Sequence, residues 1–389
     1  MRLYRVEDEV RLSVSRDLRD WRKAGLLTAD EEVQLQADVT TDLRRAKIML
    51  RLGLAVFTVI AGAAAIGLVL LVTSLDSEVA VSITAAGLGA VAFGAATAIV
   101  TRFRMYRYGV EEALALGAVG LWGVSAGLLA SGIFRTNSGA DAWFFAMAAV
   151  TAGCAVAYRR FGFQYAAVGA IVAAALLPMA SSAVDVEFKR LFAVLVCTAA
   201  FVYASRVRQE ADDDVTRADA EVIRAAAAAG AYLALNSVLL AEPFGRQVDS
   251  WYRWSSWLVT WLLPFLLGRT AVIERDPLLL RVAIATGLAS LVSNKAYLGW
   301  PRQPWDPMLL GVLLVAGALV LRRWLSSGEG GERNGFTARQ LVESEGATIR
   351  LASVASVAVQ PAPTRAVATP DDTTFSGGRS GGAGAGTSF

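Results

Sequence analysis

Residues 52–75 read LGLAVFTVIAGAAAIGLVLLVTSL and carry no charged side chain. A helix needs roughly 20 apolar residues to cross a bilayer, because lipid cannot satisfy the hydrogen bonds of an open backbone. The stretch is long enough, and comparable runs follow at 79–101, 112–134, 142–158, 165–184, 189–206, 220–241, 254–273, 278–294 and 307–325. We therefore predict an all-α fold, a polytopic transmembrane helix bundle of about ten spans.

The composition agrees with this class and removes several kinds of chemistry. Of the 389 residues, 55% are hydrophobic, which is too many for an ordinary soluble domain. The chain has no histidine, so Ser-His-Asp catalysis, Cys-His catalysis and His-based zinc sites are excluded. Cys154 and Cys197 fall inside predicted spans, where we expect them to pack as small apolar residues. No Walker A, G-x-G-x-x-G or H-E-x-x-H pattern occurs, so we predict no cofactor and no metal site, and lean away from an enzyme.

The placement of positive charge predicts the orientation in the membrane. With ten spans, the main Lys and Arg groups all fall on one side, as the positive-inside rule requires of the cytoplasmic side. We therefore predict that both termini are cytoplasmic. The abundance of Arg over Lys and of Ala suggests a bacterial genome, and hence a multi-pass protein of the bacterial cytoplasmic (inner) membrane. The groups are 44–51, Arg102, Arg104, Arg107, Arg159, Arg160, Arg206, Arg208, Arg269, Arg275, Arg322 and Arg323.

Two regions flank the predicted bundle of residues 48–325. Residues 1–47 predict a cytoplasmic helical hairpin, with Gly25 ending its first helix and a capping box from Thr28 to Glu31 starting the second. A hairpin of this size cannot bury a large core, so we expect it to pack on the bundle's loops, on a second copy or on a partner. Residues 326–389 are rich in Gly, Ser and Ala and predict a disordered cytoplasmic tail.

The N-terminal pattern resembles a known family. Trp21-x-x-x-Gly25-Leu26-Leu27, a short acidic helix, a basic run and a Gly/Ala-rich first span are similar to the bacterial domain-of-unknown-function 2157 membrane proteins. Many of those have an Asn-Trp-Asp-like step after the first span, of which residues 73–76 keep only the acid, Asp76. The family has no assigned activity. The resemblance therefore implies the multispan architecture and no mechanism.

An aromatic cluster is the most distinctive local feature, and topology puts it on the outer side. Stacked aromatic rings beside arginines suit a sugar, a lipid headgroup or a peptide. The alternative is an interfacial belt, which Trp and Tyr form in most membrane proteins, and we favour the belt. The candidate ligand-binding residues are Trp251, Trp254, Trp257, Trp300, Trp305, Arg253 and Arg302.

A second candidate is a polar site at the middle of the membrane. Asn236 lies deep in the seventh predicted span, and Pro178 and Pro264 interrupt the fifth and eighth. Broken helices of this kind form substrate sites in transporters. The alternative is an interhelical hydrogen bond at Asn236 and ordinary kinks at the prolines, which we favour.

These observations rank three functions. The leading hypothesis is an integral inner-membrane protein of unknown activity, non-enzymatic, that acts through protein or lipid contacts in the envelope. Its partners are then the lipid bilayer and a protein bound through the hairpin or the tail, with no nucleic acid. The first alternative is a small-solute carrier or channel that uses the midplane site. The second is an enzyme acting on a lipid-linked substrate at the aromatic cluster.

Overall fold

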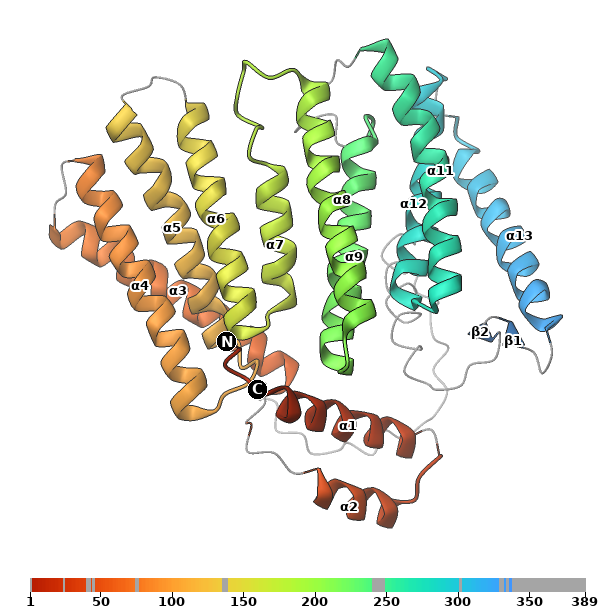
Figure 1. Cartoon of the computed structure of the whole chain (residues 1–389), viewed down its shortest axis with the longest axis horizontal. Helices are drawn as coiled ribbons and strands as arrows, with labels where there is room; N and C mark the ends of the chain where they lie inside the picture. The colour runs from red at the N-terminus through yellow and green to blue at the C-terminus, as the bar shows by residue number, and fades with distance from the viewer. Residues whose placement is uncertain are drawn as a thin grey trace, which may run out of the picture. The chain divides into compact units, whose positions relative to one another are not determined.

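The computed structural model describes residues 2–23, 25–39, 43, 46–73, 77–134, 139–239, 249–300, 303–328, 332–333 and 336–337. The predicted disordered tail lies almost wholly outside these residues. All the elements belong to one compact unit, Met1–Arg339. They are α1 (Val6–Lys23), α2 (Ala29–Asp38), α3 (Ile48–Thr73), α4 (Glu78–Phe103), α5 (Val110–Phe134), α6 (Gly139–Phe161), α7 (Gln164–Ala175), α8 (Val186–Glu210), α9 (Asp214–Leu235), α11 (Ser250–Glu274), α12 (Pro277–Tyr297), α13 (Asp306–Ser326), and the short antiparallel pair β1 (Glu332–Arg333) and β2 (Phe336–Thr337) (Figure 1).

Each predicted span coincides with a helix, but not every helix is long and apolar enough to cross a membrane. Seven among the described residues are: α3, α4, α5, α6, α8, α11 and α12. This set indicates a membrane protein. α7 has only 12 residues, and α9 carries charged side chains through its N-terminal half. The count of ten spans is therefore not established by length and composition alone.

The fifth predicted span, 165–184, begins with α7 but extends past the end of this helix. α7 ends at Ala175, and turns follow through Ala180. Pro178 lies in these turns, so it follows the helix and does not kink it. The physical reason is that proline has no N–H to donate and disfavours helical geometry at the preceding residue, Leu177.

Successive helices pack side by side from α4 to α9, and α9 also packs on α12, which pairs with α11 (Figure 1). Small residues allow the closest approach. A Cβ added at Gly123 would lie 2.6 Å from Val150 Cγ2, and one at Gly127 would lie 3.2 Å from the Ala142 carbonyl oxygen. The Gly123-x-x-x-Gly127 step of the sequence thus joins α5 to α6.

The first membrane-length helix is tied to the bundle near its start. Arg51 on α3 forms a two-pronged ion pair with Glu112 on α5, with Nε 2.7 Å from Oε2. A Cβ at Gly109 would overlap the Arg51 carbonyl oxygen, and Gly109 has φ +98°, so both the contact and the backbone require glycine there. No residue of α3 is buried, which leaves its apolar surface available to lipid.

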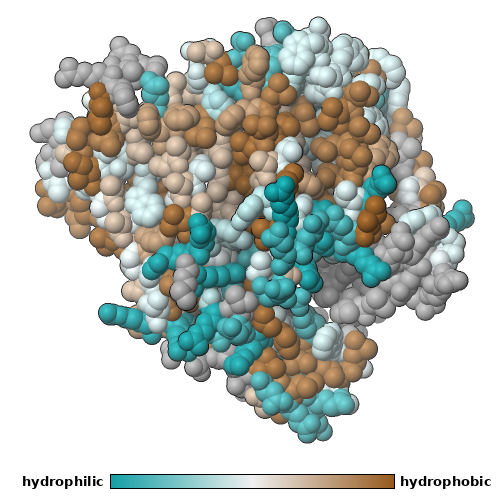
Figure 2. All heavy atoms as spheres, viewed as in Figure 1, coloured by the Kyte–Doolittle hydropathy of each residue, from teal (hydrophilic) through white to brown (hydrophobic). Residues whose placement is uncertain are grey.

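The N-terminal segment has the predicted hairpin features. Gly25 follows α1 with φ +73°, and Thr28 and Glu31 form the predicted capping box at the start of α2. Figure 2 shows hydrophilic residues gathering in the lower part of the view, around the α1–α2 hairpin and the nearby helix ends, below the apolar helix surfaces. Polar and apolar surfaces therefore separate along the helix axes, as they do in proteins that face both lipid and water.

Candidate functional site

Residues 2–4 are fastened to three helix ends. The Leu3 N–H donates to the Arg160 carbonyl at the end of α6 (2.8 Å), and the Tyr4 hydroxyl donates to the Met105 carbonyl after α4 (3.0 Å). The Tyr4 ring meets the Tyr106 ring edge to face, with centroids 4.9 Å apart. Tyr4 belongs to a buried cluster with residues of α4, α5 and α6. The start of the chain is therefore part of the core and not a loose extension.

Arg2 makes the charged part of this attachment. Its Nη2 lies 3.1 Å from Asp219 Oδ2 on α9 and 3.1 Å from Glu9 Oε2 on α1. Gln164 at the start of α7 donates to the other Asp219 oxygen at 2.8 Å. We call this group, Arg2, Tyr4, Glu9, Tyr106, Gln164 and Asp219, the N-terminal latch.

A glycine makes room for Arg2. Gly162, between α6 and α7, has φ +70°, and a Cβ there would overlap the Arg2 guanidinium. A residue with a side chain is therefore disfavoured at this position for two reasons. The positive φ is strained for an L residue, and the Cβ would clash with Arg2. The sequence Phe161-Gly162-Phe163 thus forms a turn whose two rings stack in the core, 5.2 Å apart, while its glycine receives the arginine.

The latch holds two buried carboxylates against one guanidinium. Glu9 is 4% and Asp219 is 2% exposed. Burial raises the pKa of Glu9 above its usual value, and the nearby Arg2 and the Tyr106 hydroxyl oppose this rise. Burial likewise raises the pKa of the Tyr4 and Tyr106 hydroxyls. Attachment of the N-terminal segment is therefore sensitive to the charge on Glu9.

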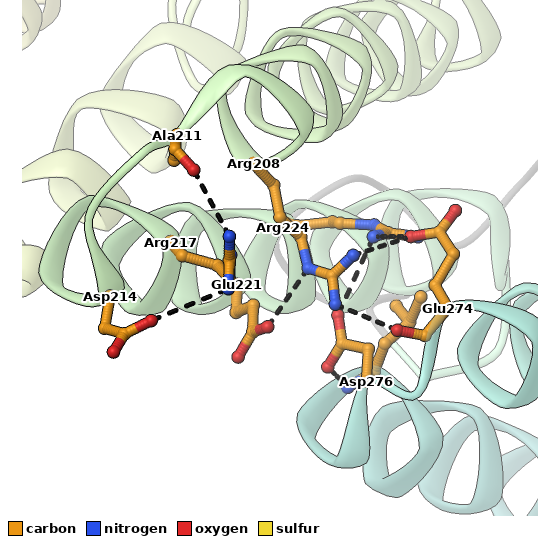
Figure 3. Close-up of polar contacts among 9 residues, drawn as sticks. Arg208, Ala211, Asp214, Arg217, Glu221, Arg224, Glu274 and Asp276 are labelled. Carbon is orange, nitrogen blue, oxygen red and sulfur yellow. Dashed lines mark hydrogen bonds and ion pairs between the residues drawn. The ribbon is translucent and has the colours of Figure 1, made fainter. Parts of the chain in front are cut away.

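A second ionic cluster lies at the ends of α8, α9, α11 and α12 (Figure 3). Arg224 on α9, which is 1% exposed, pairs with Glu274 and lies 3.7 Å from Asp276 Oδ2. Its guanidinium also lies 5.0 Å from the centre of the Phe201 ring. Arg208 on α8 reaches Glu221 at 3.0 Å and donates to the Glu274 carbonyl at 3.0 Å (Figure 3).

The chemistry available in this cluster is mainly structural. Asp276 also caps α12 by accepting from the Leu279 N–H at 2.9 Å. The cluster therefore fixes four helix ends, with α9 as the element that it shares with the latch. Within the described part of the chain, no three His, Cys, Asp or Glu side chains are placed to hold a metal ion.

The sequence suggested that Asn236 lies deep within a helix, but it does not. α9 ends at Leu235, and Asn236 is its fully buried C-cap. Its amide nitrogen donates to the Tyr232 hydroxyl (3.1 Å) and to Ser293 Oγ (2.9 Å), and its amide oxygen accepts from the backbone N–H groups of Val238 and Leu239 at 3.1 Å each. All of its side-chain hydrogen-bonding capacity is used by the protein.

Arg190 is the residue of this region that sequence reasoning missed. It was not among the candidate residues predicted from the sequence, but α8 begins at Val186 and Arg190 is fully buried. Its Nη1 donates to the Ala234 (3.2 Å) and Asn236 (3.3 Å) carbonyls at the end of α9. A cation suits the C-terminal end of a helix, where unpaired carbonyls carry negative charge.

The three residues of the predicted midplane site occupy different settings. Asn236 is a helix cap and Pro178 lies in a turn. Pro264 is buried inside α11, beside Gly287 of α12, where an added Cβ would lie 3.7 Å from the proline ring. The sequence therefore pointed to the polar region around Asn236 but did not predict its structure. Asn236 caps the end of a helix and does not lie at a break within one.

The predicted aromatic cluster is only partly gathered. Trp254 and Trp257 meet edge to face with centroids 6.1 Å apart, and Trp257 Nε1 donates to Asn294 at 2.9 Å. Arg253 donates to the last carbonyls of α12, those of Ala296 (3.0 Å) and Tyr297 (2.8 Å). Trp251, Trp254, Trp300 and Trp305 are each more than half exposed. Arg302 lies outside the described residues.

Comparison with known proteins found no match to a protein-family model, to a curated protein or to a solved structure. The resemblance to the domain-of-unknown-function 2157 family therefore stays a prediction.

Proposed function

We propose that the protein is a multi-pass, non-enzymatic protein of the bacterial inner membrane that holds its N-terminal hairpin at the cytoplasmic surface for a protein partner. The observation that carries this proposal is the latch. Arg2, Tyr4 and Glu9 fasten the hairpin to the helix ends through buried contacts, so the hairpin is presented in a fixed position. A rigid presentation reduces the ordering cost of binding.

The hairpin offers apolar side chains that its own fold leaves uncovered. Trp21 is 45%, Leu26 66%, Val33 67% and Leu35 42% exposed. Apolar side chains on the spanning helices are exposed because they face lipid. The hairpin lies in water in this proposal, so lipid does not explain the exposure of these four side chains. Exposed aromatic and aliphatic residues of this kind commonly supply the buried centre of a protein interface.

The proposed orientation follows from charge. Basic residues gather at the helix ends that the latch contacts, with Arg102, Arg104 and Arg107 after α4 and Arg159 and Arg160 at the end of α6. The positive-inside rule assigns that side to the cytoplasm. With α7, α9 and α13 counted, ten spans return the chain to the same side, so both termini are cytoplasmic in this proposal.

Cysteine labelling tests the orientation, because both native cysteines are buried. We expect Gln34→Cys on α2 to resist a membrane-impermeant maleimide in intact cells and to react after the membrane is opened. Ser182→Cys, between α7 and α8, should react in intact cells. The reverse pattern would refute the orientation.

Purification from native membranes tests the partner. We expect a stoichiometric protein to accompany the wild type and to be lost from a Leu26→Glu, Val33→Glu double variant. Gln34→Glu adds a charge at another exposed position of α2 and should retain the partner. A wild type that brings no protein, or a double variant that keeps it, would overturn the proposal.

The carrier and enzyme alternatives have weaker support. Asn236, the polar centre of the carrier hypothesis, already makes its full set of hydrogen bonds within the protein. The charge of Arg253, which the enzyme hypothesis needs at the aromatic cluster, is directed to the end of α12. The polar groups of Asn236 and Arg253 are therefore already used within the protein, whereas the apolar side chains of the hairpin are exposed. This difference favours the partner proposal.

A further inference from the structure

A cavity of about 390 Å³ lies between the N-terminal segment and the last turn of α4. Leu3, Tyr4, Arg5 and Asp8 form one wall, and Val100, Thr101 and Arg104 form the opposite one. The latch therefore creates this space, because it holds residues 3–8 beside α4. Of the latch residues, Tyr4 lines the cavity.

The walls carry charges of both signs. Arg5 and Arg104 supply guanidinium groups, which suit a phosphate because they donate several hydrogen bonds in one plane. Asp8 supplies a carboxylate. The last turn of α4 ends here, and its terminal carbonyls also favour a cation. A simple anion would meet both of these negative features, so the lining suits a ligand with a phosphate and an ammonium group.

The position of the cavity favours a ligand that belongs to a membrane. α4 is long and apolar enough to span, and the cavity lies at its end. Phe103, in the same last turn, is 57% exposed. Leu43, on the segment that leads to α3, adds an apolar side chain to the lining. A headgroup in the cavity can therefore keep its acyl chains in the lipid beside α4.

We propose that this cavity binds the headgroup of a zwitterionic phospholipid, with the phosphate at Arg5 and Arg104 and the ammonium group at Asp8 and the end of α4. The shared chemistry is a phosphoethanolamine unit, which a lipid or the free phosphomonoester can supply. This inference goes beyond the partner proposed above and does not depend on it.

Native mass spectrometry of the full-length, delipidated protein tests the site. The probes are phosphatidylethanolamine, phosphatidylglycerol with the same acyl chains, and free phosphoethanolamine. We expect the wild type to prefer phosphatidylethanolamine over phosphatidylglycerol by about tenfold, the ratio that one charge-assisted contact gives. Lipids bound elsewhere on the helices contribute alike to the wild type and to the variants, so the difference in the ratio between these proteins reports this site.

Two variants test the ammonium contact and the phosphate contact of the headgroup separately. Asp8→Asn should abolish the preference and leave phosphatidylglycerol binding intact, whereas Arg5→Gln should weaken the binding of both lipids. Asp17→Asn, at an exposed position of the same helix, is the matched control and should keep the preference.

The outcomes decide both the chemistry and its source. Equal binding of the two lipids by the wild type, or an unchanged preference in Asp8→Asn, would overturn the site. Free phosphoethanolamine that binds as tightly as the lipid would support the headgroup chemistry and refute the membrane source. Loss of the protein partner in the hairpin variants has no bearing on any of these results.

Discussion

Replacing Gly162 with alanine should detach the N-terminal segment while the helices stay folded. Alanine at φ +70° costs about 1 kcal/mol, and its Cβ would displace the Arg2 guanidinium. Arg2 would then lose Glu9 and Asp219, whose side chains are only 2% and 3% exposed. Removing one partner of a buried pair costs about 3–5 kcal/mol, but the Arg2 side chain is 20% exposed, so the lower part of that range applies.

The combined loss of docking free energy is about 3–4 kcal/mol, which corresponds to a roughly 150- to 900-fold rise in the population of the detached segment. Hydrogen exchange measures it directly. The Leu3 amide is protected only while it donates to the Arg160 carbonyl, so its exchange should accelerate by this factor.

A second glycine supplies the control. Gly25 also has a positive φ, +73°, but a Cβ there meets no atom within 4 Å. Gly25→Ala therefore carries the backbone cost without a clash, and should leave Leu3 exchange unchanged. Equal protection of Leu3 in the wild type, Gly25→Ala and Gly162→Ala would refute the latch.

Three further changes test the packing, the second ionic cluster and the titration of the latch. Gly123→Ala should lower the free energy of unfolding of the solubilised protein, measured by thermal denaturation, by about 1–3 kcal/mol. Gly120→Ala is the control, because no atom lies within 4 Å of its added Cβ, and it should not lower this free energy. Arg224→Ala removes the cation beside the fully buried Asp276 and should cost about 3 kcal/mol in the same assay, against less than about 1 kcal/mol for the exposed Arg217→Ala. Because burial raises the pKa of Glu9 above 4.5, docking should be strongest below pH 4.5 and weaken as the pH rises through the docked-state pKa. Glu9→Gln should reduce this pH dependence in the opening constant of the Leu3 amide, after correction for intrinsic exchange, while Asp219, the other carboxylate that shares Arg2, remains to contribute.

The results that would contradict these expectations differ in kind. A destabilising Gly120→Ala would mean that α5 tolerates no side chain on either face, and that Gly123 is not special. Arg217→Ala as harmful as Arg224→Ala would mean that burial does not govern the ionic cluster. An unchanged pH slope in Glu9→Gln would assign the titration to another group near the latch.

Much of the fold could be predicted because lipid imposes a strong local rule on sequence. A helix in lipid must be apolar along its whole length, so its position appears as a continuous run. Helices α3 and α4 illustrate this, since their bounds differ from the predicted spans by a few residues. The rule fails at α7, where the apolar run continues past Pro178 although the helix has already ended. Hydropathy alone does not register where the backbone stops being helical.

The latch could not be predicted, because its parts lie far apart in the chain. Arg2 and Asp219 are separated by 217 positions, and neither is unusual in its own surroundings. Gly162 was the one local signal available, since a glycine between two helices and two phenylalanines favours a positive φ or a close approach. That signal indicates that something must approach, but not that an arginine from the chain's start does so.

Asn236 and Arg190 show why a buried polar residue in a membrane protein does not by itself indicate transport. Such residues are often functional because an unpaired polar group in lipid is costly. That cost is removed here: Arg190 donates to the carbonyls that end α9, and Asn236 receives the backbone that leaves it. Both residues satisfy backbone groups at the C-terminal end of α9, so their burial is explained by how α9 terminates. Glu9 and Asp219 differ from these two residues, because they are buried carboxylates that share a single arginine, and this imbalance predicts that the latch responds to pH.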